Sequence, residues 1–155
     1  MSDKGESYKV ISDNRQARFR YEILETYEAG IELKGTEVKS IRVGKVNLRD
    51  GYGLIRGGEA WLLNVHISPY QNINEYFNHD PRRSRKLLLH RKEINKLTGK
   101  LEQQGLTLVP LKIYLKRGLV KVSIGLGRGK KLHDKRETIK RRQDQRDMAR
   151  AIKRY

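Results

Sequence analysis

The stretch Leu111-Lys-Ile-Tyr-Leu-Lys-Arg-Gly-Leu-Val-Lys-Val-Ser-Ile-Gly-Leu126 decides the fold class of this 155-residue chain. Apolar and polar residues alternate on both sides of Arg117-Gly118, and this period of two predicts an antiparallel hairpin that turns at those two residues. One face of the hairpin is expected to be core and the other basic. The expected core residues are Leu111, Ile113, Leu115, Val120, Val122, Ile124 and Leu126, and the expected outer residues are Lys112, Tyr114 and Lys116.

Two further segments have strand character. A mixed alternation that is rich in β-favouring residue types predicts a strand over residues 19–26. Between residues 46 and 65 the apolar residues recur at short spacing around several glycines, which predicts a second hairpin with Trp61 and Leu63 facing inward. Residues 68–85 are rich in Asn, Asp and Pro and are expected to form a long loop or a loosely paired edge.

Short helical segments are predicted at three places. Thr36 is the expected N-cap of a helix within residues 35–42. Apolar residues share one helical face over residues 94–101, and this helix is expected to cover one opening of the sheet. Asn14 is expected to cap a single turn within residues 14–20.

Several short antiparallel strands with short helices indicate a mainly β protein with an OB-like antiparallel β-barrel. A flat α+β sheet is the alternative. We expect a flexible N-terminal segment over residues 1–12, the barrel over residues 13–127, and a basic C-terminal tail over residues 128–155. The closely spaced glycines from Gly125 to Gly129 are expected to form a hinge between barrel and tail.

The net charge of +17 and the sequence pI near 10.2 indicate a polyanionic partner, with nucleic acid first and an acidic protein as the alternative. The tail has twelve Lys and Arg against four acids and only five large apolar side chains, so we expect it to be disordered when free and to fold on binding. The same shortage of apolar residues disfavours a membrane surface. The N-terminus lacks the apolar stretch of a signal peptide, so we expect a soluble cytoplasmic protein.

The residue pattern gives little support to catalytic or metal-binding chemistry. The chain has no cysteine, which excludes disulfides, thiol nucleophiles and Cys-ligated metals. Its four histidines lack metal-binding spacing, and no catalytic residue, metal or cofactor is expected. A phosphate-binding loop is disfavoured because Ile124 and Lys131 stand where that pattern needs Gly and Ser or Thr. A nuclease built on His79, Asp80 and His90 is a minor alternative, since His79-Asp80 fits a turn better.

Basic residues concentrate in three places, with aromatic residues near them in the sequence. Two clusters are Arg15-Arg18-Arg20 and Arg82-Arg83-Arg85-Lys86, and the third is the tail. Lys and Arg contact phosphates, while exposed aromatic rings and Arg planes stack on unpaired bases. Three such clusters together with the net charge indicate an RNA- or DNA-binding protein.

Several longer phrases resemble the family of SsrA-binding proteins, also called small protein B. They run in family order from about residue 14 to residue 136 and so cover nearly the whole chain. The phrases are Asn14-Arg-Gln-Ala-Arg18, Tyr27-Glu-Ala-Gly30, Gly35-Thr-Glu-Val-Lys-Ser40, Gly44-Lys-Val-Asn47, His66-Ile-Ser-Pro-Tyr70, His79-Asp-Pro-Arg82, Arg85-Lys-Leu-Leu-Leu-His90, Thr107-Leu-Val-Pro-Leu111, Gly129-Lys-Lys131 and His133-Asp-Lys-Arg136.

The resemblance implies an OB-like barrel that binds the tRNA-like domain of transfer-messenger RNA (tmRNA). It also implies delivery of this RNA to bacterial 70S ribosomes stalled without a stop codon, the rescue process called trans-translation. Elongation factor Tu is implied as an indirect partner through the charged RNA. The resemblance implies no catalysis by the protein itself.

A surface that binds the tRNA-like domain is also implied by the resemblance. Its residues match Asn14, Arg15, Glu28, Leu87 and Lys121 in this chain, and Arg18 joins them as part of the first basic cluster. Lys121 agrees with the basic outer face expected of the hairpin. Glu28 does not follow from electrostatics, because a carboxylate repels phosphates, but it is able to accept hydrogen bonds from base or ribose donors or to orient an arginine.

For the tail, the resemblance implies a place in the empty messenger channel and decoding centre of the ribosome. There the lysines are expected to hold phosphates and His133 to stack on a ribosomal base. The matching residues are Gly129, Lys130, Lys131, His133, Asp134, Lys135 and Arg136.

The main rival interpretation is a general RNA-binding or RNA-chaperone protein, which the same net charge permits. It predicts steep salt dependence with no preference among structured RNAs. The family interpretation predicts selective binding of the tRNA-like domain that survives physiological salt.

Overall fold

The hairpin predicted from residues 111–126 forms the longest strand pair of the protein. The structure, a computed structural model, describes residues 8–71, 73–102, 105–130, 142–143 and 146. β8 (Leu106–Lys116) and β9 (Leu119–Gly129) pair antiparallel along their full lengths. Arg117 and Gly118 form the turn with φ angles of 53° and 77°, the left-handed geometry that a two-residue hairpin loop of this kind requires. The predicted turn is therefore confirmed.

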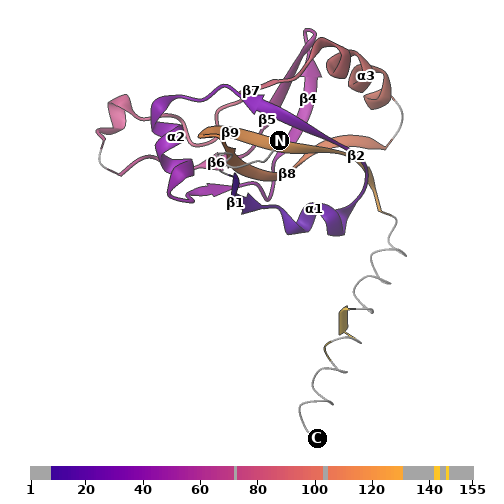
Figure 1. Cartoon of the computed structure of the whole chain (residues 1–155), viewed down its shortest axis with the longest axis horizontal. Coiled ribbons are helices and arrows are strands. Elements are labelled where there is room, and N and C mark those ends of the chain that lie inside the picture. The colour runs from indigo at the N-terminus through magenta and orange to yellow at the C-terminus, as the bar shows by residue number, and fades with distance from the viewer. Residues whose placement is uncertain (1–7, 72, 103–104, 131–141, 144–145, 147–155) are drawn as a thin grey trace, which may run out of the picture.

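The two strands of this hairpin form a closed ring together with four other strands (Figure 1). The strands follow the order β8-β4-β5-β7-β2-β9, and β9 pairs with β8 again. Gly53 of β4 opposite Leu108 of β8 closes the ring. A closed antiparallel ring confirms the mainly β, OB-like barrel and removes the flat-sheet alternative. The additional strands are β2 (Tyr21–Ile31), β4 (Tyr52–Arg56), β5 (Glu59–Leu63) and β7 (Arg85–Leu88).

Short elements decorate the ring. A two-stranded sheet pairs β3 (Val46–Asn47) with β6 (His66–Ile67). Within the loop predicted over residues 68–85, Glu75–Phe77 form the 3-10 helix η1, and β7 begins at Arg85. The α-helices with described bounds are α1 (Arg15–Arg20), α2 (Gly35–Arg42) and α3 (Arg91–Leu101).

All three predicted helical segments form, with one correction to a cap. α3 packs against β4 and β8 and buries Ile94 and Leu97, as the helical pattern predicts. Lys34, not Thr36, occupies the N-cap position of α2, and its backbone N–H donates to Glu37 Oε1 at 2.8 Å. The first turn thus begins earlier because Glu37 satisfies an N–H at the helix start.

The described end of the N-terminal segment, from residue 8 on, forms a strand. Residues 1–12 were expected to be flexible, but Tyr8–Asp13 form β1, which pairs antiparallel with the end of β8. β4 pairs with β8 only at Leu108, so β1 occupies the edge that β8 exposes further along. The sequence did not predict this strand because both of its faces are largely exposed, so it lacks the alternation of apolar and polar residues.

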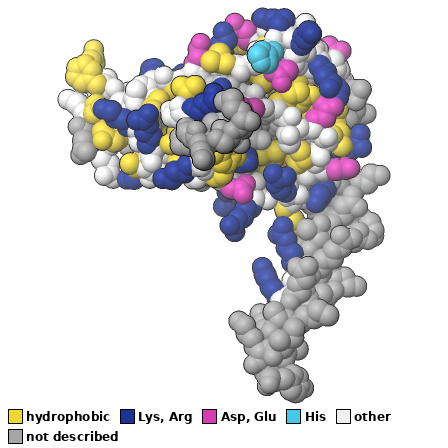
Figure 2. All heavy atoms as spheres, in the orientation of Figure 1, with side chains coloured by type: hydrophobic (Ala, Val, Ile, Leu, Met, Phe, Trp, Pro, Cys, Tyr) yellow, Lys and Arg dark blue, Asp and Glu magenta, His cyan; other side chains and the backbone are white. Residues whose placement is uncertain are grey.

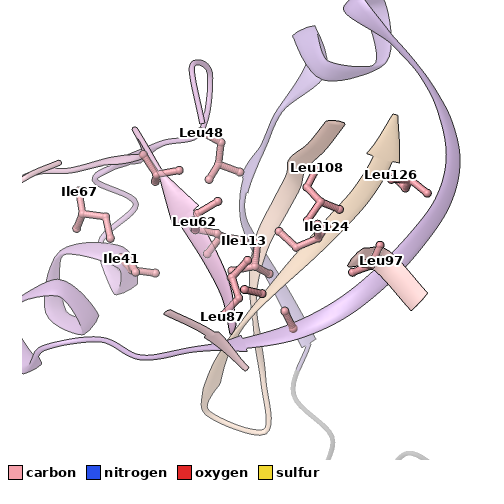
Figure 3. Close-up of a cluster of buried hydrophobic side chains, with 14 residues drawn as sticks. Ile41, Leu48, Leu62, Ile67, Leu87, Leu97, Leu108, Ile113, Ile124 and Leu126 are labelled. Carbon is pink, nitrogen blue, oxygen red and sulfur yellow. The ribbon is translucent and has the colours of Figure 1, made fainter. Parts of the chain in front are cut away.

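The barrel core is lined by every second residue of β9 and by matching residues of the other strands. Val122, Ile124 and Leu126 are at most 1% exposed, as the sequence predicts. Figure 3 shows the core side chains converging from the strands, from α2 and from α3. The core residues labelled in Figure 3 are Ile41, Leu48, Leu62, Ile67, Leu87, Leu97, Leu108, Ile113, Ile124 and Leu126. Leu115 and Val120, which were predicted to be core residues, lie near the hairpin turn and are only partly buried.

Bulges change which face of β8 and β2 points inward. The register of β8 against β9 shifts between Pro110 and Lys112, and that of β2 shifts between Ile23 and Glu25. As a result Leu111 leaves the barrel core and joins a second buried cluster outside the ring. This cluster contains Ala17, Val109 and Leu111, with Tyr21 and Ile23 packed against it. The prediction that Leu111 and Ile113 share one core is therefore wrong.

The inward residues of β5 are the reverse of those predicted. Ala60 and Leu62 are fully buried, whereas Trp61 and Leu63 are partly exposed on the outer side. The sequence analysis predicted that Trp61 and Leu63 face the core. In the ring, the inward residue Ala60 lies opposite Leu87, and the inward residue Leu62 lies opposite Arg85.

The glycines expected to form a hinge are part of the barrel. Gly125 and Gly127 are buried within β9, on its outer side, where the second cluster covers them. A Cβ on Gly127 would lie 2.9 Å from Tyr21 Cβ, and one on Gly125 would lie 3.0 Å from Leu111 Cδ1. β9 continues to Gly129, beyond the expected boundary at residue 127. These two glycines serve close packing and not backbone freedom.

A buried ion pair joins α2 to β7. Glu37 and Arg85 are fully buried, and Arg85 Nε donates to Glu37 Oε2 at 2.5 Å. Arg83 Nη2 reaches the other carboxylate oxygen at 2.5 Å, and Arg85 Nη1 donates to Val65 O at 2.8 Å. Burial raises the pKa of Glu37, but the hydrogen bonds from Arg83, the Lys34 backbone and Arg85 outweigh it and leave the pKa below its ordinary value.

Replacing Arg85 should expose the cost of an unpaired buried charge. Arg85→Met is expected to lower the free energy of unfolding by about 3–5 kcal/mol, measured by urea denaturation, because Glu37 loses a buried partner. Lys86→Met is the matched control: Lys86 pairs with Glu59 at 3.0 Å on the surface, and its loss should cost less than about 1 kcal/mol. Equal losses in the two variants would contradict the structural role of Arg85.

Replacing Gly127 by alanine tests whether this glycine is part of a hinge or of a closely packed strand. Gly127→Ala is expected to lower the free energy of unfolding by roughly 1–3 kcal/mol through overpacking against Tyr21. Gly129→Ala is the control, since a Cβ there meets nothing within 4 Å. If thermal and urea unfolding leave both variants equally stable, the packing explanation fails.

Candidate nucleic-acid interface

A mixed aromatic and basic surface covers the outer side of β1, β8, β9 and β2. Cross-strand pairing places Tyr114 opposite Lys121, Lys116 opposite Tyr8, and Lys112 opposite Ser123. Glu28 stands opposite the same Ser123 from the β2 side. We call this surface the tyrosine–lysine face, and it consists of Tyr8, Glu28, Lys112, Tyr114, Lys116 and Lys121.

Two tyrosines and a lysine form the middle of the tyrosine–lysine face. The rings of Tyr8 and Tyr114 have centroids 5.0 Å apart and are tilted by 40°. Lys112 Nζ lies 5.3 Å from the Tyr8 centroid and 5.4 Å from that of Tyr114, and it donates to Tyr8 Oη at 2.6 Å. Tyr8 is 52% exposed, whereas Tyr114, predicted as an outer residue, is only 3% exposed. Tyr8 is therefore the ring that this group presents to solvent together with a cation.

Glu28 is held by its neighbours on the same face. Tyr114 Oη donates to Glu28 Oε2 at 2.5 Å, and Lys116 Nζ lies 3.4 Å from Oε1. The Tyr114 hydrogen bond has the largest effect on Glu28, and together with Lys116 and Lys121 it outweighs the opposing effect of burial and keeps the pKa of Glu28 below its ordinary value. The carboxylate thus orients a tyrosine and lysines, not an arginine, and its charge is partly compensated by them.

α1 continues this surface along the same side of the sheet. Asp13 pairs with Lys112, and the Asn14 backbone N–H donates to Leu111 O at 2.7 Å, so the chain enters α1 beside the tyrosine–lysine face. The exposed side chains of α1 include Arg15, Arg18 and Arg20. Figure 2 shows Lys and Arg side chains over much of the visible face, including the region of α1.

Asn14 has a structural position in place of the expected cap, and its RNA contact stays a prediction. It occupies the N-cap position of α1, but its side chain makes no capping hydrogen bond. Its Nδ2 donates to Leu48 O at 3.3 Å and to Pro110 O at 2.9 Å, and the residue is 6% exposed. Asn14 therefore fixes α1 against the barrel, and both of these contacts use its donor group.

Leu87 is 1% exposed and belongs to the barrel core. Its part in RNA binding stays a prediction, since the structure shows only that its side chain is buried. The next residue, Leu88, is 48% exposed and lines a groove of about 330 Å³ with Gly30, Leu119 and Lys121. The alternation of a strand brings only one of two successive leucines to the surface, and here that residue is Leu88.

Each residue of the second basic cluster has a partner within the protein, although only Arg85 is fully buried. Arg83 and Arg85 bind Glu37, as described above, and Lys86 pairs with Glu59. Arg82 Nη1 donates to Asn64 Oδ1 at 2.7 Å. The prediction that this cluster forms an RNA-binding surface is therefore wrong for Arg85, since its acidic partner lies far away in the sequence on α2.

His79 is held by the fold as well. It is 4% exposed, its Nε2 donates to Ile67 O at 2.8 Å, and its Nδ1 lies 2.8 Å from Thr36 Oγ1. Both ring nitrogens thus have internal partners, which leaves no free nitrogen for the nuclease alternative. His90 is instead exposed at the N-cap of α3.

Most of the tail residues singled out by the sequence lie outside the described residues: Lys131, His133, Asp134, Lys135 and Arg136. Gly129 ends β9, and the Lys130 backbone N–H donates to Arg20 O at 3.0 Å, which places the start of the tail beside α1. Farther along, the guanidinium carbon of Arg142 lies 5.2 Å from the Phe19 ring centroid.

The described residues contain no helix that is both long and apolar enough to cross a membrane. Within those same residues, no group of three His, Asp or Glu side chains is arranged to hold a metal ion.

Comparison with known proteins shows which family this chain belongs to. The family described as "SmpB protein" matches residues 11–154. The SsrA-binding proteins of Nostoc punctiforme and Nostoc sp. are each 77% identical to this chain over 155 residues, covering 100% of both chains. A solved structure described as "tmRNA-SmpB: a journey to the center of the bacterial ribosome" contains a chain that is 56% identical, with a TM-score of 0.67 over 83% of this chain and 93% of that chain.

Removing one hydroxyl should raise the pKa of Glu28. In Tyr114→Phe the carboxylate loses its strongest hydrogen bond, so its pKa should move up toward 4.5, measured by NMR titration of the side-chain carboxyl carbon. A lowered pKa stabilises the fold above pH 4.5, and this contribution is lost as the pH falls through the lowered value. Tyr8→Phe is the control and should leave Glu28 unchanged; a similar shift in both variants would overturn the assignment.

Proposed function

The chain belongs to the SmpB protein family, and on that premise we propose that it binds the tRNA-like domain of tmRNA and delivers it to stalled ribosomes for trans-translation. The proposal is supported by relatives named SsrA-binding protein that match the whole chain and by a similar chain from a tmRNA–SmpB ribosome structure. The protein acts as an RNA-binding adaptor in the cytoplasm and catalyses no step itself.

The observation that carries the proposal is the continuous surface formed by the tyrosine–lysine face and α1. Arg15 and Arg18 supply phosphate contacts that position a folded RNA. Lys121 adds a cation beside the groove that Leu88 lines, so one edge of this surface combines apolar area with charge. Such a mixture suits the ribose edges and unstacked bases of a structured RNA better than a uniform duplex backbone.

Glu28 fits this surface through the residues that it orients. Its carboxylate holds the Tyr114 hydroxyl and lies near Lys116. With its charge partly compensated in this way, Glu28 is able to accept a hydrogen bond from a base or a ribose hydroxyl without repelling the whole RNA. A charged surface alone binds any RNA, so an acceptor at this place favours one RNA shape over others.

The tail forms the second functional part of the proposal. Residues 129–136 enter the empty messenger channel and decoding centre, where lysines hold phosphates and His133 stacks on a base. The barrel meanwhile holds the tRNA-like domain, and elongation factor Tu joins through the charged RNA. The start of the tail beside α1 supports this division, since it joins the RNA-binding surface directly to the tail.

The proposal is tested by binding to the tRNA-like domain against excess ordinary tRNA at physiological salt. The full-length protein should bind selectively. Lys121→Gln should weaken binding roughly tenfold through loss of a charge-assisted contact, while Lys92→Gln, which removes an equally positive but distant exposed residue of α3, should change it little.

Truncation after Lys130 separates the two parts of the proposed function. Binding to the tRNA-like domain should remain, while tagging of stalled chains in a translation assay should be lost. Equal loss of both activities would contradict the division of labour. Equal, salt-sensitive binding to all RNAs by the full-length protein would favour the general RNA-binding alternative.

A further inference from the structure

A second outer surface lies on the other half of the ring from the tyrosine–lysine face. In the ring order, β4, β5 and β7 stand between β8 and β2 on the side away from β9. Pairing places Leu54 of β4 and Lys86 of β7 on either side of Trp61 of β5. Around Trp61 the surface is hollowed to about 390 Å³, and we call this the Trp61 groove, lined by Leu54, Arg56, Trp61, Leu63 and Ser84.

The Trp61 groove is not required by the barrel core. The inward residues of β5 are Ala60 and Leu62, which are fully buried, so Trp61 points to the outer side and stays partly exposed. Leu54 and Leu63 beside it are also only partly buried. A large aromatic side chain is thus kept at the surface of a strongly basic chain, together with two leucines, which is the composition of a ligand-binding hollow.

The rim of the Trp61 groove is cationic. Glu59, the cross-strand partner of Arg56, is the nearby acid, but its Oε1 binds Lys86 Nζ at 3.0 Å. Among the described residues no ion pair is recorded for Arg56, which is exposed. Arg56 is therefore available to pair with an external anion. The exposed Ser84 hydroxyl on the same rim is able to donate and to accept a hydrogen bond.

We propose that the Trp61 groove binds an unpaired nucleotide of an RNA, with the base stacked on Trp61 and the adjacent phosphate held by Arg56. An apolar floor with one aromatic face matches a base, and a free guanidinium at the rim matches a phosphate. An acidic peptide would use Arg56 but would leave the indole face without a matching group. The site goes beyond the proposed function, because it gives the barrel a second RNA contact that uses neither Lys121 nor α1.

Trp61 is the only tryptophan of the chain, so its own fluorescence reports whether a base stacks on it. The experiment titrates the full-length protein with a short single-stranded adenosine oligonucleotide and follows quenching of this fluorescence. An abasic oligonucleotide of the same length supplies the same phosphates without bases. We expect the adenosine oligonucleotide to quench the emission and the abasic one to leave it nearly unchanged.

Substitutions at two residues, Trp61 and Arg56, test the two halves of the groove. Trp61→Leu keeps an apolar side chain but removes stacking, and oligonucleotide affinity, measured by anisotropy of a labelled strand, should fall about tenfold. Trp61→Phe keeps an aromatic ring and should retain most of the affinity, which separates stacking from a folding defect. In Arg56→Gln the salt dependence of log affinity should become shallower by about 0.7. Arg42→Gln is its control, since Arg42 is an exposed arginine on α2.

The outcomes distinguish this inference from the proposed function. Quenching that persists in Lys121→Gln, which is impaired in binding the tRNA-like domain, supports a separate site. Quenching by the oligonucleotide in a protein with no preference for the tRNA-like domain would sink the proposed function and leave the Trp61 groove standing. Equal effects of abasic and adenosine oligonucleotides, or full affinity in Trp61→Leu, would overturn the groove as a nucleotide site, and quenching by an acidic peptide alone would assign it to a protein partner.

Discussion

The structure depends on one constraint, which is that β9 runs without a bulge between two strands that each contain one. β8 and β2 shift register against it near Leu111 and Leu24, and their inward faces change there. β9 keeps one face in the core throughout, so its outer face must receive the side chains that the bulged strands turn outward. Gly125 and Gly127 leave the space for them. The second buried cluster and the position of α1 against the barrel both follow from this packing.

The distribution of charge explains how so basic a chain folds. Several acids hold basic residues in fixed places: Glu37 binds Arg83 and Arg85 in the interior, while Glu25 binds Lys100 and joins β2 to α3. Lys100 and Tyr27 lower the pKa of Glu25 to about 2, so this carboxylate stays ionised under ordinary conditions. Arg83 and Arg85, which resemble part of an RNA-binding cluster in the sequence, thus have a structural role. The basic surface is formed by the Lys and Arg residues that these acids do not bind.

The closed ring gives the protein two opposite outer faces with different chemistry. On the side of β2, β9 and β8, tyrosines, lysines and one oriented carboxylate form a broad surface that α1 extends. On the side of β4, β5 and β7, a single tryptophan lies in a hollow with a cationic rim. A small barrel is able to present both because each strand exposes alternate residues outward, and the ring turns those residues in opposite directions.

Local sequence patterns were enough to predict the β8–β9 hairpin, α3, the mainly β class and the basic character, because alternation, helical spacing and charge are local properties. They also indicated Lys121 on the outer face, and the family resemblance indicated Glu28. The folded arrangement was needed to learn that Leu88 is exposed and Leu87 buried, that Trp61 faces outward, that Gly127 is packed and that Arg85 is internal. Each of these depends on register, bulges or a partner distant in the chain, and strand alternation alone does not tell which of its two faces will meet the core.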